Sequence, residues 1–193
     1  MQKGALRLNE SQEAALIRRC QAGDKEAFST LVERYRSVLF GTAYLMVQDR
    51  GLAEDAVQEA LIKIWKNLPA FQLKSSLKTW LVRIVVNEVK QHFRKKQVPT
   101  VPLEQAFEVA DDFDKAETAM IRNEERHNLK RILRMLPQEQ REAVVLRYFS
   151  ELTVPEIAVV TGQREGTIKS RLSRALSHLL EILRSDIAWE GGR

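Results

Sequence analysis

Residues 153–174 read TVPEIAVVTGQREGTIKSRLSR and contain the strongest structural signal in the chain. Thr153, followed three residues later by Glu156, forms a capping box that predicts the start of a helix. Gly162 supplies the left-handed exit that ends this helix, and a second helix begins near Glu165. Two helices joined by so short a turn have the spacing of a helix-turn-helix.

The second of these helices presents a basic, hydroxyl-rich face. We expect the first helix to pack through Ile157, Ala158 and Val159, and the second through Ile168 and Leu172. Lys and Arg reach phosphates or guanine edges, and Ser and Thr donate to phosphates, so the exposed face suits a DNA groove. The candidate contacts are Gly166, Thr167, Lys169, Ser170, Arg171 and Arg174. A helical hairpin with a solvated basic face is the alternative.

Apolar residues recur at helical spacing almost everywhere else, so the predicted fold class is all-α. The predicted helices cover residues near 11–22, 25–46, 52–68, 77–96, 138–149, 153–161 and 165–183, and helix also resumes near 117. The last helix is expected to turn Leu176, Leu179, Leu180 and Leu183 inward. No stretch predicts a strand convincingly.

A proline-containing acidic segment separates the two helical regions. Pro99 and Pro102 interrupt any regular helix, because proline lacks the amide donor and constrains its predecessor. The net charge is +7 over residues 1–97, −5 over 98–117 and +3 over 118–193. The sequence therefore predicts two small helical bundle domains, at 1–97 and 117–193, joined by a flexible acidic linker at 98–116.

The composition argues against a membrane-spanning, secreted, disulfide-bonded or metal-binding protein. Hydrophobic residues make up 44% of the 193 residues, and no apolar run approaches the ~18 residues that span a membrane. The first ten residues lack a signal-peptide core, so we expect a cytoplasmic protein without membrane insertion. A single cysteine excludes an intramolecular disulfide, and the three scattered histidines predict no metal site and no cofactor. Glu54, Asp55 and Glu59 are neighbours on one helix, which is more typical of surface charge than of a metal site.

Four stretches together resemble bacterial extracytoplasmic-function (ECF, group 4) sigma factors. The stretch at 165–175, EGTIKSRLSRA, resembles the recognition helix of that family, and 136–148, LPQEQREAVVLRY, resembles its lead-in. The stretch at 53–60, AEDAVQEA, resembles the polymerase-binding helix, and 79–87, TWLVRIVVN, resembles the promoter-melting helix. The resemblance implies sigma domains 2 and 4, binding to core RNA polymerase, and direction of the polymerase to promoter DNA.

The resemblance also implies roles for individual residues. Those implied to bind the largest polymerase subunit are Asp55, Gln58, Glu59, Ile62 and Lys63. Those implied to contact the minus-10 element are Phe71, Lys74, Ser75, Lys78, Arg83, Asn87, Lys90 and Arg94. For the minus-35 element, Arg164 and Glu165 join the six recognition-helix residues named above.

The chemistry of these residues agrees with such roles. Carboxylates and amides on an exposed helix face can pair with Arg-rich partner helices, or can simply keep that face soluble. The Asn87 amide can read an unpaired base edge. The loop at 71–78 resembles one that captures a flipped base, a process that needs no ATP. Gln72, Leu73 and Leu77 depart from the usual pattern of that loop, which leaves the captured base undefined.

The resemblance further implies regulation by an anti-sigma factor that masks one or both domains. The acidic linker either threads through basic channels of the polymerase or serves only as a solubilising spacer. A stand-alone helix-turn-helix regulator is the alternative function, but it does not explain the N-terminal half. An enzyme acting on nucleic acid lacks support, since the histidines are dispersed and no ligand cluster is visible.

Overall fold

The computed structural model describes residues 10–73, 75–96 and 128–190, and within these ranges it is helical with no strand. The all-α prediction is therefore confirmed. The helical elements are α1 (Glu10–Gln21), α2 (Lys25–Val47), α3 (Arg50–Asn67), η1 (Leu68–Ala70), α4 (Leu77–Lys96), residues 128–135, α6 (Gln138–Val144), η2 (Val145–Phe149), α7 (Val154–Thr161) and α8 (Glu165–Glu190). The predicted linker at 98–116 and the helix expected from 117 to 127 lie outside the described residues.

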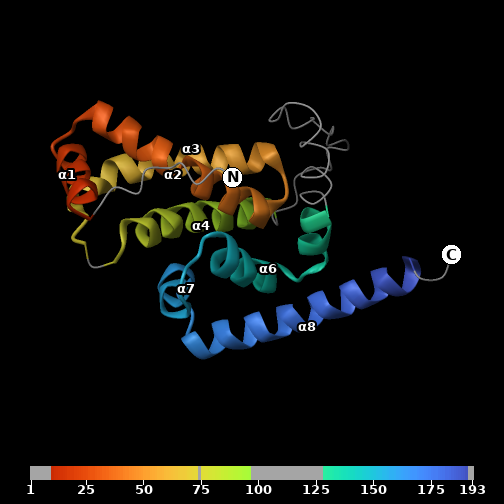
Figure 1. Ribbon diagram of the computed structural model, residues 1–193. Helices are drawn as coiled ribbons and strands as arrows, with labels where there is room; N and C mark the ends of the chain where they lie inside the picture. The colour runs from red at the N-terminus through yellow and green to blue at the C-terminus, as the bar shows by residue number, and fades with distance from the viewer. Residues whose placement is uncertain (1–9, 74, 97–127, 191–193) are drawn as a thin grey trace.

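The N-terminal half is a bundle in which α2, α3 and α4 pack against one another (Figure 1). Their apolar stripes meet in a core that includes the fully buried Leu31, Leu39, Ile64 and Leu81. α1 packs on α2 and on the η1 turn, and so closes one end of the bundle. This burial gives each helix its stability, because isolated helices of such length are marginal in water.

Short polar caps set the helix boundaries. Gly23 adopts φ 85°, and the Asp24 side chain then accepts hydrogen bonds from the backbone amides of Glu26 and Ala27, each at 3.0 Å. Asp49 caps α3 in the same way through the amide of Leu52. The cap predicted at Asp24 is confirmed, and it orients α2 relative to α1.

The C-terminal half packs α6, η2, α7 and α8 around the buried Leu146, Leu152, Ile157 and Ile168. The helix predicted over 138–149 changes at Val145 into a π-helical turn that ends at Phe149. Such single turns place one extra residue in a helix and bend its end. The turn brings Phe149 and Ser150 next to α2 of the other half.

Two inward-facing predictions were wrong. Val159 is 52% exposed, and Val160 is buried in its place. In α8, Leu176, Leu180 and Leu183 are 43%, 56% and 44% exposed. The helix continues well beyond α6 and α7 (Figure 1), so its distal part lacks a surface on which to bury every apolar residue of the periodic pattern.

We predict that Asp24→Asn reduces the acid sensitivity of stability. Hydrogen bonds from the Ala27 amide and the Arg19 side chain lower the pKa of Asp24 below its ordinary 3.8. The stabilising contribution of the charged form is thus present above pH 3.8 and is lost as the pH falls through the lower pKa of the folded state. Asparagine still caps the helix. The stability advantage of the wild type over the variant, measured by urea unfolding, should shrink below pH 4; an advantage independent of pH would contradict this account.

Candidate functional site

The helix-turn-helix is built as its sequence predicts. The Thr153 hydroxyl accepts a hydrogen bond from the Glu156 amide, and the Glu156 carboxylate accepts one from the Thr153 amide at 2.8 Å. Gly162 ends α7 with φ 71°. Ile157 and Ile168 are fully buried and hold the two helices together, which leaves the first turns of α8 facing outward.

Most of the predicted minus-35 residues have exposed side chains, and two are partly buried within the domain. The exposed ones are Arg164, Glu165, Gly166, Lys169, Ser170 and Arg174. Arg174 donates to the Ser170 hydroxyl at 3.0 Å, and a Cβ built on Gly166 would meet nothing within 4 Å. Thr167 is half-buried, and Arg171 is 13% exposed in an ion pair with Glu139 at 2.7 Å. The pairing directs Arg171 toward α6.

The outer face of α3 carries three of the predicted polymerase-binding residues. Asp55, Gln58 and Ile62 lie three and four residues apart, and all three are exposed, with Ile62 at 56%. An acidic, an amide and an apolar side chain thus form one small surface, which we call the α3 outer face. Ala56 and Ala60 are fully buried beneath it, so the backbone is fixed where the exposed side chains begin.

The other two predicted polymerase-binding residues turn toward α4. Lys63 Nζ lies 2.5 Å from Glu88 Oε2, and the Glu88 side chain is only 2% exposed. Glu59 Oε2 lies 3.6 Å from His92 Nε2. Sequence analysis missed these partners, although one signal was available: Glu88 stands between the buried residues Val86 and Val89.

The predicted minus-10 residues differ in exposure. Arg83, Asn87 and Arg94 are exposed along one side of α4, which we call the α4 outer face. Phe71 is buried with its ring centroid 4.9 Å from that of Trp80. Ser75 is half-buried, and Lys74 lies outside the described residues.

The remaining two predicted minus-10 residues are paired with the C-terminal half. Lys90 Nζ lies 2.8 Å from Glu142 Oε1, and Lys78 Nζ lies 3.9 Å from Glu151 Oε2. No local pattern could have revealed these pairs, because each joins residues that are far apart in the sequence.

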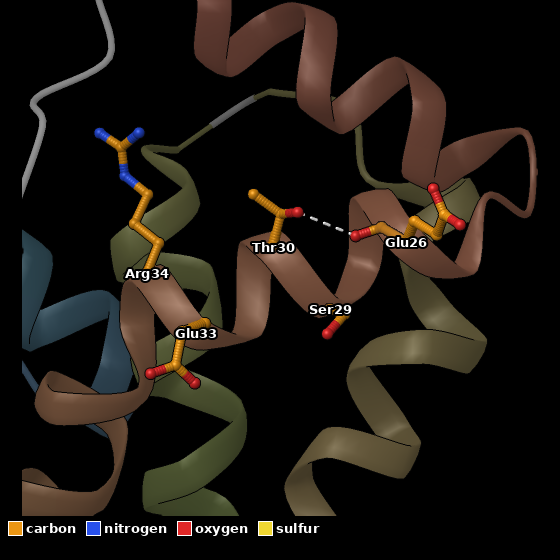
Figure 2. Close-up of a pocket in the computed structure, with 5 residues that line it drawn as sticks. All are labelled: Glu26, Ser29, Thr30, Glu33 and Arg34. Carbon is orange, nitrogen blue, oxygen red and sulfur yellow. Dashed lines mark hydrogen bonds between the residues drawn. The ribbon is translucent and has the colours of Figure 1, made fainter.

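Figure 2 shows a separate pocket whose labelled side chains all come from α2: Glu26, Ser29, Thr30, Glu33 and Arg34. It contains none of the predicted site residues, and the Thr30 hydroxyl donates to the Glu26 carbonyl at 2.9 Å as part of the helix itself. Among the described residues, no group of His, Cys, Asp or Glu side chains could hold a metal ion. None of the helices in those ranges is long and apolar enough to cross a membrane.

Comparison with known proteins places both halves in one class. The sigma-70 region 2 model matches residues 31–98, and the sigma-70 region 4 model matches residues 126–179. RNA polymerase sigma-H factor from Pseudomonas aeruginosa is 36% identical over 177 residues, which cover 87% of this chain and 92% of that protein. The ECF sigma factor SigM from Mycobacterium tuberculosis is 35% identical, covering 91% and 86% of the two chains.

A solved structure agrees with these sequence matches. The sigma factor RpoE from Bartonella quintana, in complex with the anti-sigma factor NepR, is 30% identical with a TM-score of 0.65, covering 82% of this chain and 98% of that one. CnrH, in complex with the cytosolic domain of CnrY, has a TM-score of 0.67 at 23% identity and supports the fold. The chain belongs to the ECF family of RNA polymerase sigma factors. It is therefore an alternative sigma factor, a transcription initiation factor that binds core RNA polymerase and promoter DNA.

We predict that Lys63→Ala lowers the free energy of unfolding by about 1–3 kcal/mol, because it leaves the buried Glu88 carboxylate without its partner. Lys66→Ala is the matched control, since Lys66 is exposed on the same helix and the change should stay within about 0.5 kcal/mol. Denaturant unfolding measures both. Equal small effects would show that Lys63 has no structural role in joining α3 to α4.

Proposed function

We propose that this sigma factor divides its work among three exposed surfaces. The α3 outer face, with Asp55, Gln58 and Ile62, binds the largest subunit of core polymerase. The α4 outer face, with Arg83, Asn87 and Arg94, contacts the minus-10 element, and the start of α8 contacts the minus-35 element. The separation of the three sets on different helices is the observation that carries this assignment.

The chemistry of each surface supports its assignment. Asp55 and Gln58 offer oxygen acceptors to Arg-rich helices, and Ile62 adds apolar area that water disfavours. Asn87 stands between two arginines along α4, so an amide that can read a base lies between cations that can hold phosphates. On α8, Lys169 and Arg174 are exposed and can enter a groove.

In this proposal, residues 1–97 form sigma domain 2, residues 98–116 form an acidic linker and residues 117–193 form sigma domain 4. The matches to region 2 and region 4 support this division. The linker gives each domain a high effective concentration once the other has docked, so neither needs tight affinity alone. Because its partner polymerase transcribes the chromosome, we place the protein in the cytoplasm, and we assign it no catalytic step of its own.

Strand opening would follow from capture of a flipped base near the loop at 71–78. Phe71 is buried against Trp80 in this structure, so it supports the base of that loop rather than offering an exposed stacking surface. The exposed Gln72 and Leu73 stand at the tip, and Leu73 has φ 56°. Extrusion of a base costs a few kcal/mol, which contacts in the loop must offset.

An anti-sigma factor is the proposed regulator. The related RpoE from Bartonella quintana was solved with the anti-sigma factor NepR. The three exposed surfaces make such masking physically feasible, because a partner that covers any one of them blocks a required contact.

The division of labour predicts separable defects. Lys169→Ala or Arg174→Ala should weaken binding of the polymerase complex to the minus-35 element by roughly 5- to 150-fold, and should leave association with core polymerase intact. Arg184→Ala, an equal charge change in an exposed residue farther along α8, is the control.

Changes on the α3 outer face should show the opposite pattern. Gln58→Ala should weaken association with core polymerase by roughly fivefold or more, as for a contact worth about 1 kcal/mol, and Lys66→Ala should not. Fluorescence anisotropy of the labelled sigma factor with unlabelled core polymerase measures association, and anisotropy of labelled promoter DNA with the polymerase complex measures DNA binding. If the α8 and α3 variants were equally defective in both assays, the division of labour would be wrong.

Sequencing of transcript starts tests the function itself. Core RNA polymerase is incubated with fragmented genomic DNA, with and without the purified protein. New starts that share two upstream motifs at fixed spacing would support the proposal and identify the promoter. DNA binding without polymerase, together with no new starts, would favour the stand-alone regulator.

A further inference from the structure

The end of α1 lies beside the loop at 71–78, which runs into the first turn of α4 (Figure 1). α1 packs on η1, and η1 leads directly into that loop. Sequence analysis assigned no residue of α1 to promoter recognition. The structure nevertheless places the last turn of this helix where it can act on the loop.

Gln21, the last residue of α1, holds the entry of the loop. Its side-chain Nε2 donates to the Phe71 carbonyl at 3.0 Å and to the Leu68 carbonyl at 3.3 Å. A glutamine amide carries two N–H donors, so each carbonyl can receive one of them. The side-chain oxygen cannot take this place, because it would then face two other acceptors. The two carbonyls therefore fix the orientation of the Gln21 amide.

The backbone around Gln21 is itself well supported. Cys20 beside it is buried in the bundle core. Gly23 follows with φ 85°, and Arg19 and Asp24 form an ion pair at 2.7 Å across the turn that leads to α2. Because Gln21 stands between a buried residue and a closed turn, it offers the loop a rigid attachment.

The two ends of the loop are also anchored by the rest of the bundle. At the entry, the Phe71 amide donates to the Leu68 carbonyl at 3.1 Å, and the Phe71 ring packs on Trp80. At the exit, the Ser76 hydroxyl accepts the Thr79 amide at 3.1 Å and so caps α4. The Gln21 amide adds an attachment to α1 at the entry.

Leu73 lies between these anchors, at the tip of the loop. Its side chain is 62% exposed, and its backbone has φ 56°. Leucine rarely adopts this left-handed conformation, and it keeps it only where the surrounding structure holds it there. The place of the exposed leucine therefore depends on the anchors, and loss of the Gln21 contacts would free the entry of the loop to move.

We propose that Gln21 is a positioning residue for promoter melting: by holding the Leu68 and Phe71 carbonyls, it places Leu73 where the loop receives an extruded base. The inference rests on the proposed capture of a base by this loop. Gln21 acts through the loop and does not touch the DNA. Its contribution is geometric, because a misplaced loop cannot make the contacts that offset the cost of extrusion.

Two variants separate hydrogen-bond donation from shape. Gln21→Met removes the donors and keeps a similar chain length and helix propensity. Gln21→Glu keeps the shape, but at pH 8 its ionised carboxylate places only acceptors against the two carbonyls. If donation is what positions the loop, both variants should have the same defect. Gln12→Met is the matched control, since Gln12 is exposed in the same helix.

The measurement combines protein variants with changes in the DNA. Core polymerase with the wild type or a variant binds labelled forked DNA, whose non-template strand carries the minus-10 sequence found by start mapping, either intact or with one abasic position. For the wild type, removal of the captured base should weaken binding by roughly 5- to 150-fold, as for the loss of one stacked base. Leu73→Ala identifies that base, because the variant should lose less affinity than the wild type when the base is removed.

Gln21→Met and Gln21→Glu should each reduce this abasic penalty by at least about threefold, whereas Gln12→Met should keep it. A merely structural role for Gln21 would weaken binding to intact and abasic DNA alike. An unchanged penalty in either Gln21 variant would therefore overturn the inference while leaving base capture intact. A Gln21 variant that also lost association with core polymerase would contradict it too, because the inference confines the effect to the loop.

Failure of the proposed function has a different outcome. If no abasic position weakened binding of the wild type, or if Leu73→Ala reduced no penalty, capture of a base by the loop would be wrong and the inference with it. A wild-type protein that gives no new transcript starts would overturn the promoter assignment as a whole.

Discussion

The carboxylate of Glu156 is the contact on which the arrangement of both halves depends. Through one oxygen it begins α7, and through the other it accepts the Thr79 hydroxyl of α4. A capping residue usually acts only on its own helix, but here the same group fixes where the helix-turn-helix stands relative to the bundle. Because both oxygens are occupied, a shift of α4 relative to α7 must break a charge-assisted hydrogen bond or disturb the cap.

The helical period explains how so small a protein presents several exposed polar surfaces on different helices. In α3 the buried Ala53, Ala56, Ala60 and Ile64 share one side, which leaves Asp55, Gln58 and Ile62 on the other. Small alanines allow α3 to approach its neighbours closely, so the outer residues extend from a rigid support. The Lys63–Glu88 pair then joins this helix to α4, which couples the position of the α3 outer face to that of the α4 outer face.

Sequence reasoning succeeded where the signal was local and periodic. The capping box at Thr153, the left-handed Gly162 and the cap at Asp24 each depend on neighbouring residues, and each is present. It failed for Val159 and for the distal leucines of α8, because periodicity identifies an apolar stripe and not whether a partner covers it. The pairs that engage Lys90 and Arg171 join distant segments, so only the folded chain brings them together. The roles of the individual site residues stay predictions.

The length of α8 has a consequence for its dynamics. Its first turns are held by Ile168 and Ala175, which are fully buried, whereas Leu176, Leu180 and Leu183 are about half exposed. The proximal segment shares the cooperative stability of its domain, but the distal segment depends mainly on intrinsic helix propensity. One continuous helix thus has a base fixed by burial and a part at 176–184 whose apolar side chains are only about half covered. The distal part of α8 therefore gains less from packing than the beginning of the helix does, so its stability depends more on helix propensity.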